Sequence, residues 1–234
     1  KLFIIWLVAL VCTISLMSLE NTYAVDQGPQ YYTPGSSAFG IPYQEWLEKW
    51  WGWWFGNPGD VHPQNATLNY DSKLCSVNQK GPVWFLYDLE QPNVQVKCQI
   101  PVGKGILLPI STTMTDQGTT PNLDLKGLET NANNIETAPT NMIVKVDGKP
   151  IDVKNLFAKT NKFNVTIPHD FCYSCMQTGK TTPGSYPAYA TGYFLLLHNL
   201  SAGEHTIELH VVDSLANTKV LAEKRGGQFN ILVK

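Results

Sequence analysis

The segment 169–176 holds the densest group of side chains that could do chemistry. It presents an imidazole, two thiols and a thioether, from His169, Cys172, Cys175 and Met176. These soft ligands suit copper or zinc, and no other cofactor is expected. A Cys-X-X-Cys pair can also be redox-active if its first thiolate has a lowered pKa. The composition favours a third interpretation, a structural disulfide that closes a loop outside the cell.

A second group of residues is aromatic, and its spacing is helical. Apolar residues recur close to i, i+3, i+4 and i+7, which predicts an amphipathic helix over 42–55. The candidate interface on this helix consists of Tyr43, Trp46, Trp50, Trp51, Trp53 and Trp54. About a third of a helix circumference can enter a core, so three indoles can be buried together but not all five.

The indoles left outside the core would meet a glycan, a partner protein or a membrane surface, because their rings are both apolar and polar. The alternative is that the helix belongs to the core and that the preceding segment covers the remaining rings. Helix aromatics usually serve the core, and this alternative is therefore favoured.

Recognisable catalytic motifs are absent from the sequence. It contains no Gly-X-Ser-X-Gly elbow, no His-Glu-X-X-His helix and no phosphate-binding loop. The remaining histidines are expected to be structural, and the odd spacing of His205 and His210 places them on opposite faces of a strand. We therefore predict no catalytic residues and no enzyme, although a hydrolase dyad formed by distant residues is left open.

The first 24 residues resemble a secretory signal peptide. Lys1 precedes an apolar run, and Thr22-Tyr23-Ala24 offers a small-residue cleavage site. The alternative is that residues 2–19 are retained as a membrane anchor, since they approach the roughly 17–25 residues of a span. Either interpretation predicts an exported protein that is extracellular, periplasmic or on the cell surface.

Cysteines and glycosylation sequons fit this location. After the leader, four cysteines remain, an even number typical of an oxidising compartment, namely Cys75, Cys98, Cys172 and Cys175. They allow three pairings, of which the nearest-neighbour set, 75–98 with 172–175, is the most economical. Asn65 and Asn199 are the expected glycosylation sites, because the sequon at Asn164 falls within a strand pattern.

The rest of the chain reads as β-structure. We expect an extended arm over 25–40, then one domain over 41–234 with a long polar insertion at 111–141 that includes a short helix or lid. Short alternating or apolar runs predict strands near 82–87, 94–100, 105–110, 142–146, 149–153, 163–167, 193–197, 205–212 and 228–233. Asp147-Gly148 marks a hairpin turn. The expected fold is an all-β antiparallel sandwich, immunoglobulin-like or jelly-roll, with an N-terminal Trp-rich helix.

The amino-acid composition excludes some classes of protein and of binding partner. The chain has 234 residues, 43% of them hydrophobic, with 17 Lys and Arg against 19 Asp and Glu. The apolar fraction excludes wholesale disorder, and the near-neutral balance excludes a broadly basic surface for nucleic acid. Charged residues make up only 15% of the chain, which suits an exterior surface rich in uncharged polar groups.

An ordered series of short motifs resembles a family of secreted, uncharacterised proteins of bacteria and archaea. The motifs include Trp46–Trp53, His62-Pro63, Gly81–Leu86, Pro101–Gly105 and Leu200–Ile207. The resemblance runs from Tyr43 to the C-terminus and implies an exported β-sandwich with a Trp-rich helix and a Cys75–Cys98 bridge. It implies no activity, and the Cys172–Cys175 insert departs from it.

The sequence thus predicts an exported structural or interaction module without catalytic activity, in an envelope assembly or self-associated. The alternatives are a carbohydrate-binding module that uses the Trp face and a copper or zinc protein that uses the 169–176 cluster. Other envelope proteins, a second copy, glycans or a membrane surface are the expected partners.

Overall fold

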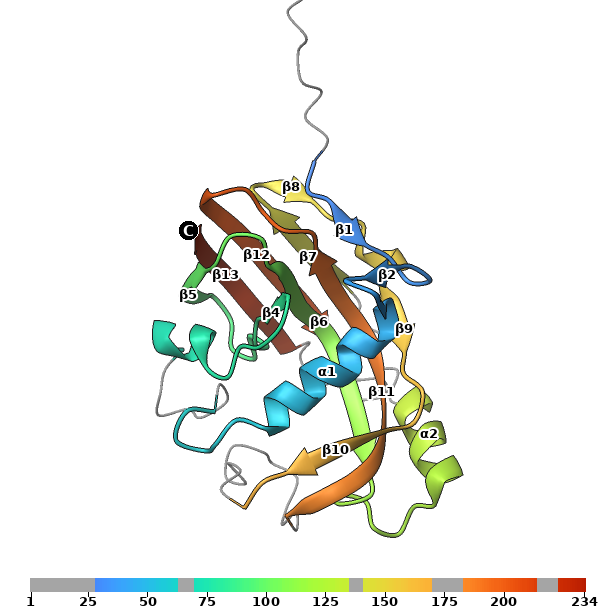
Figure 1. Cartoon of the computed structure of the whole chain (residues 1–234). Helices are drawn as coiled ribbons and strands as arrows, with labels where there is room; N and C mark the ends of the chain where they lie inside the picture. Colours follow the sequence, from blue (N-terminus) through green and yellow to red (C-terminus); the bar gives the residue numbers. More distant parts are fainter. Residues whose placement is uncertain (1–27, 63–69, 135–140, 170–182, 214–222) are drawn as a thin grey trace, which may run out of the picture.

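A computed structural model describes residues 28–62, 70–134, 141–169, 183–213 and 223–234 (Figure 1). Most of these residues form strands. The elements are β1 Tyr31–Tyr32, β2 Ser37–Ala38, β3 Ile41–Pro42, α1 Tyr43–Phe55, η2 Ser72–Ser76, β4 Val83–Phe85, β5 Val94–Ile100, β6 Gly105–Asp116, α2 Leu125–Asn134, β7 Asn141–Val146, β8 Lys149–Pro150, η3 Val153–Asn155, β9 Phe157–Lys159, β10 Phe163–Ile167, β11 Gly184–Leu197, β12 Gly203–Asp213 and β13 Glu223–Val233.

The strands form two main sheets. The six-stranded sheet has the order β1-β11-β6-β4, and β9 and β10 also pair with β11. The five-stranded sheet has the order β5-β13-β12-β7-β8. The expectation of an all-β fold with several sheets and a Trp-rich helix is confirmed. A wholly antiparallel arrangement is wrong, because β4 runs parallel to β6 and β5 parallel to β13.

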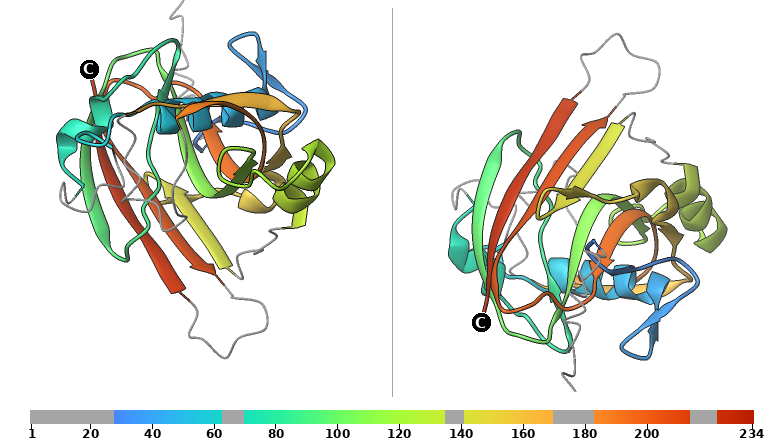
Figure 2. Two further views of the ribbon diagram at one scale, coloured as in Figure 1. Left: turned by 90° about the horizontal axis from the view of Figure 1, so that it is seen from below. Right: turned by 90° about the horizontal axis from the view of Figure 1, so that it is seen from above.

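The six-stranded sheet is buried on both faces at its centre. Residues 105–110 of β6 and 194–197 of β11 are buried without alternation. Such continuous apolar runs occur where both faces of a sheet are covered. Helix α1 packs against β10, β11, β9 and β3, while β12 of the other sheet contacts β6. The two turned views show the five-stranded sheet as a separate layer (Figure 2).

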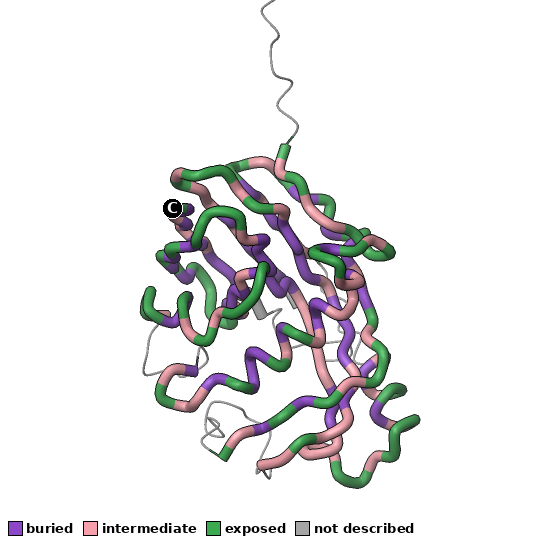
Figure 3. Tube along the Cα trace, viewed as in Figure 1, coloured by how far each residue is buried: buried purple, intermediate pink, exposed green. Residues whose placement is uncertain are grey.

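The five-stranded sheet keeps one face open. Along β5, buried residues alternate strictly with exposed ones, and the exposed positions are Gln95, Lys97 and Gln99. Phe229, Ile231 and Val233 of β13 are buried in the same way. The open face is therefore polar, while the loops that connect the strands carry most of the other exposed residues (Figure 3).

Part of the N-terminal segment, predicted as an extended arm, pairs with the six-stranded sheet. β1 pairs with β11, β2 pairs with β3, and Ala38 is fully buried. Helix α1 begins one residue later than predicted because Pro42 is its N-cap residue. The leader 1–24 lies outside the described residues. Among the helices that the structure describes, none is long and apolar enough to cross a membrane.

The polar insertion is shorter than predicted. β6 continues to Asp116, so residues 111–116 belong to the six-stranded sheet rather than to a loop. The short helix expected there is confirmed as α2, which contacts β6 and β11 and buries Leu128 and Ala132. The hairpin at Asp147-Gly148 is also confirmed. Both residues have positive φ, as a type I′ turn requires, and the turn joins β7 to β8.

Candidate functional site

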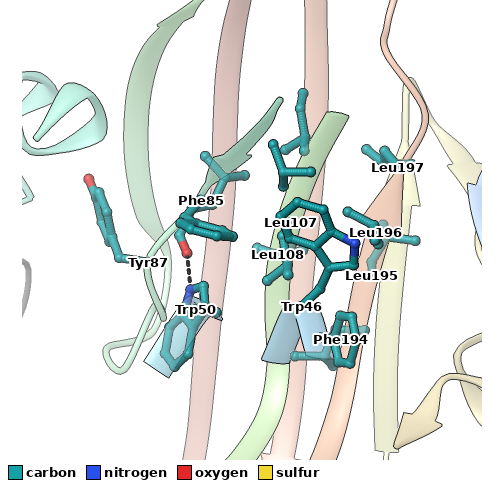
Figure 4. Packing of buried hydrophobic residues seen from close by; sticks show 14 of the residues in the cluster. Trp46, Trp50, Phe85, Tyr87, Leu107, Leu108, Phe194, Leu195, Leu196 and Leu197 are labelled. Atoms are coloured by element: carbon teal, nitrogen blue, oxygen red, sulfur yellow. Dashed lines mark hydrogen bonds between the residues drawn. The ribbon is translucent and has the colours of Figure 1, made fainter. Parts of the chain in front are cut away.

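Helix α1 packs most of its aromatic side chains into the core. Tyr43, Trp46, Trp50, Trp53 and Trp54 are all buried. Three of the indoles donate Nε1–H to carbonyl oxygens, Trp46 to Ala38 at 3.1 Å, Trp50 to Leu86 at 2.8 Å and Trp53 to Val77 at 2.9 Å. Figure 4 shows the second of these bonds within the surrounding aliphatic and aromatic side chains. These contacts agree with the interpretation favoured from the sequence, in which the helix aromatics belong to the core.

The prediction limited to three the number of indoles that can be buried together, but four are buried. Segments on a second side of α1 provide the additional cover. Trp53 lies against Phe85 of β4 and donates to Val77 just after η2, while Trp54 packs edge-on against His62. Trp51 alone among the five is partly exposed, and its Nε1 has no hydrogen-bond acceptor within the described part of the chain.

Most of the predicted metal cluster lies outside the described residues, and the cluster stays a prediction. His169 is exposed, and Cys172, Cys175 and Met176 lie outside the described residues. In the described ranges, no group of three metal-binding side chains occurs. Asn65 also lies outside them, whereas Asn199 is exposed in the loop after β11. The Cys75–Cys98 bridge is confirmed.

A groove of about 1060 Å³ lies at the edge of the five-stranded sheet. Its lining comes from η2, β4, β5, the ends of β12 and β13, and the turn after β7. The lining residues that carry the argument below are Lys73, Trp84, Lys97, Gln99, Asp147, Glu204, His205, Thr206, Asn230, Leu232 and Lys234. We call this site the β5 groove.

The floor of the β5 groove consists of two rows of side chains across neighbouring strands. In one row Asn230 lies beside Lys97 on one side and Thr206 on the other. In the second row Leu232 lies between Gln99 and Glu204 in the same way. These positions alternate with the buried residues of β5, β12 and β13, so their side chains point to the open face of the sheet.

The amide of Asn230 is held in a fixed orientation. Its Oδ1 accepts a hydrogen bond from Gln228 Nε2 at 2.6 Å, and its Nδ2 donates to Gln95 Oε1 at 3.2 Å and to the carbonyl oxygen of Val96 at 3.5 Å. An amide oxygen has two lone pairs and an amide nitrogen has two hydrogens, so Asn230 retains one acceptor site on Oδ1 for a ligand, while both hydrogens of Nδ2 are engaged. The floor therefore presents a preorganised polar group at its centre.

Covalent and hydrogen bonds fix the wall of the groove. The Cys75–Cys98 disulfide joins η2 to β5. The carbonyl oxygen of Cys75 accepts a hydrogen bond from Trp84 Nε1 at 2.8 Å. Gln79 binds both the backbone N–H and the carbonyl oxygen of Phe85, at 2.9 and 2.7 Å, and so ties the segment after η2 to β4. The partly exposed Trp84 ring is thus held rigidly in the wall of the same groove.

His205 closes the far end of the groove as a structural residue. Its Nδ1 lies 2.7 Å from Asp147 Oδ2, and its Nε2 lies 3.0 Å from the carbonyl oxygen of Ser201. Asp147 Oδ1 also accepts the Thr206 N–H at 2.8 Å. Both ring nitrogens are engaged, so this imidazole anchors the turn after β7 and presents no free nitrogen to a ligand.

The comparisons with known proteins add little. No family model matches the chain, and no curated protein matches it significantly. The solution structure of amebosin has a TM-score of 0.22 at 11% identity, covering 62% of this chain and 98% of amebosin. The cysteine protease inhibitor EhICP2 from Entamoeba histolytica has a TM-score of 0.21 at 12% identity, covering 59% of this chain and 86% of the inhibitor. Such low scores carry no argument about fold or function, and the resemblance noted in the sequence stays a prediction.

Proposed function

We propose that the protein is an exported, non-catalytic module that binds a carbohydrate in the β5 groove. The observation that carries this proposal is the composition of the groove floor, in which amide and hydroxyl side chains lie beside one partly exposed indole. Within the proposal, the two sheets form a sandwich of the immunoglobulin-like or jelly-roll kind. Such sandwiches are found in many extracellular and lectin domains.

The chemistry of the floor fits a polyhydroxylated ligand. A sugar presents many hydroxyl groups, each of which both donates and accepts hydrogen bonds. Asn230, Gln99 and Thr206 offer both kinds of partner on one open surface. The face of a sugar ring is apolar, and the indole of Trp84 provides a flat apolar surface in the wall of the groove on which such a ring can stack.

The size and openness of the groove support the same class of ligand. Its volume of about 1060 Å³ lies at the upper end of the roughly 300–1,000 Å³ typical of ligand clefts. Several linked sugar units would fill it better than a single small metabolite. Export is supported by the Cys75–Cys98 bridge, because such disulfides persist in oxidising compartments.

Calorimetric titration with a panel of plant, algal and microbial oligosaccharides tests the proposal. We expect binding by the wild-type protein and a loss of at least about tenfold in affinity for the Asn230→Ala variant, since a lost ligand hydrogen bond costs about 1.4 kcal/mol. The matched control is Trp51→Phe, which alters the partly exposed indole of α1 and leaves the groove intact.

If the wild-type and Asn230→Ala proteins bind with equal affinity and Trp51→Phe binds more weakly, the ligand binds at α1 and not in the β5 groove. No binding across the panel would contradict the carbohydrate proposal. Circular dichroism of each variant confirms that the fold is retained before its affinity is compared.

A further inference from the structure

We infer that the β5 groove selects an acidic glycan, a saccharide carrying uronate carboxylates, over a neutral one. This inference rests on the proposed function, which it deepens by naming the ligand class. Its basis is a group of lysines from three separate elements that converge on the groove, Lys73 from η2, Lys97 from β5 and Lys234 after β13.

These three ammonium groups have no carboxylate partner among the described residues. Two cations outside the groove are ion-paired, Lys145 at 3.1 Å from Glu208 and Arg225 Nη1 at 2.8 Å from Asp88. The chain as a whole has a formal net charge of −2, so a local excess of lysine runs against its average. Unpaired ammonium groups gathered at a groove raise the local concentration of anionic ligands.

The two side-chain carboxylates of the groove form no ion pair with these lysines among the described residues. Both oxygens of Asp147 are already used, one by His205 and one by the Thr206 N–H. Glu204 is exposed on β12, which is separated from β5 by β13. Glu204 forms no ion pair with Lys97 in the described part of the chain.

The arrangement places charge and hydrogen bonding on different parts of one ligand. Lys73 and Lys97 lie on the η2 and β5 side, while Asn230 and Thr206 lie one and two strands further along the floor. A uronate carboxylate would bind on the lysine side, and the hydroxyls of the same or the next sugar would bind over the amide and the threonine. A neutral chain would leave the ammonium groups without an anion.

Paired ligands that differ only in charge test this inference. The probes are oligogalacturonate and oligoglucuronate, each compared by calorimetry with its own methyl ester. We expect the free acids to bind about tenfold or more tightly than the esters, as one charge-assisted hydrogen bond would give. The advantage should shrink as salt is raised, because exposed ion pairs are screened.

Variants assign the effect to the groove. Lys97→Gln should lower the affinity for the acids about tenfold and leave the esters unchanged. Lys154→Gln, a change at an exposed lysine of η3 outside the groove, should alter neither. Equal binding of acid and ester overturns the inference while leaving the carbohydrate proposal standing. Binding of neutral panel sugars only does the same, and no binding of any saccharide overturns both.

Discussion

Trp50 has the largest fully buried side chain in the described part of the protein, and its polar atom is satisfied. The ring fills the space between α1 and the segment after β4, and Nε1 donates to the carbonyl oxygen of Leu86. Trp51, the next residue, is partly exposed, and its Nε1 has no acceptor among the described residues. The Nε1–H of Trp50 therefore stabilises the fold through a hydrogen bond, whereas the Nε1–H of Trp51 does not.

The replacement Trp50→Phe should lower the free energy of unfolding by about 1–3 kcal/mol, because it leaves a buried carbonyl without a donor and creates a small cavity. Trp51→Phe should cost less than about 1 kcal/mol, since it removes an N–H that is already unsatisfied. Urea denaturation of both variants measures the difference. Equal losses would mean that the hydrogen bond to Leu86 contributes nothing specific.

Two titrating groups near α1 have opposite effects on stability. Burial lowers the pKa of His62 from 6.5 to about 4, and burial together with the nearby Glu45 raises the pKa of Glu48 from 4.5 to about 7. Between pH 6.5 and 4 the unfolded chain binds a proton at His62 that the folded chain does not. The free energy of unfolding therefore decreases as the pH is lowered through this range. Between pH 7 and 4.5 the folded chain binds a proton at Glu48 that the unfolded chain does not. This contribution therefore increases the free energy of unfolding as the pH is lowered.

The Glu48→Gln variant should therefore expose the His62 effect. Its free energy of unfolding should fall by up to about 1.4 kcal/mol per pH unit below pH 6.5, whereas the wild-type profile stays flatter. His62→Gln, which keeps a donor near the Trp54 carbonyl oxygen, should show a rise in stability as pH falls from 7 to 4.5. Identical slopes in the wild-type and Glu48→Gln proteins would contradict this assignment.

At the scale of elements, local patterns predicted most strands and the Trp-rich helix. The alternation of β5 and the apolar spacing of α1 are properties of short segments, and both were readable in the sequence. The partners of the strands were not, because periodicity does not specify which strand lies beside which. The parallel pairs β4–β6 and β5–β13 and the pairing of β1 with β11 were missed for this reason.

Gly227 lies where two strands pack closely, whereas Gly52 has open space around it. A Cβ at Gly227 of β13 would lie 1.9 Å from the carbonyl oxygen of Val94 on β5, whereas a Cβ at Gly52 of α1 would meet nothing within 4 Å. Gly227→Ala should therefore force the two strands apart and lower the free energy of unfolding by about 1–3 kcal/mol or more, as overpacking does. Gly52→Ala should stabilise it by about 0.5–1 kcal/mol through helix propensity. Thermal unfolding compares the two, and destabilisation by both would contradict the placement of Gly52.

The Cys75–Cys98 bridge connects stability to the groove. It closes a loop of 23 residues and holds η2, which carries Lys73, beside β5. The double variant Cys75→Ala/Cys98→Ala should lose about 3 kcal/mol of stability from loop closure. It should also bind acidic saccharide more weakly even where it remains folded. Unchanged affinity in the folded double variant would show that η2 needs no covalent anchor.

At the scale of the whole molecule, the β5 groove could not be predicted from the sequence. Its residues come from segments 146 to 161 positions apart, Lys73 and Trp84 at one extreme and Asn230 and Lys234 at the other. None of them forms a local motif, and the five clustered tryptophans drew attention to α1 instead. Helix α1 is covered by β9, β10 and β11 and, at Trp53, by Phe85 of β4, and helical periodicity alone does not reveal this cover.

The most direct test of the account is a map of backbone and indole amide resonances during titration with acidic oligosaccharide. We predict shifts at Lys97, Thr206 and Asn230 and at the Trp84 indole N–H, with the Trp51 indole N–H unchanged. Shifts confined to Trp51 and the exposed positions of α1, or no shifts at saturating ligand, would contradict a carbohydrate site in the β5 groove.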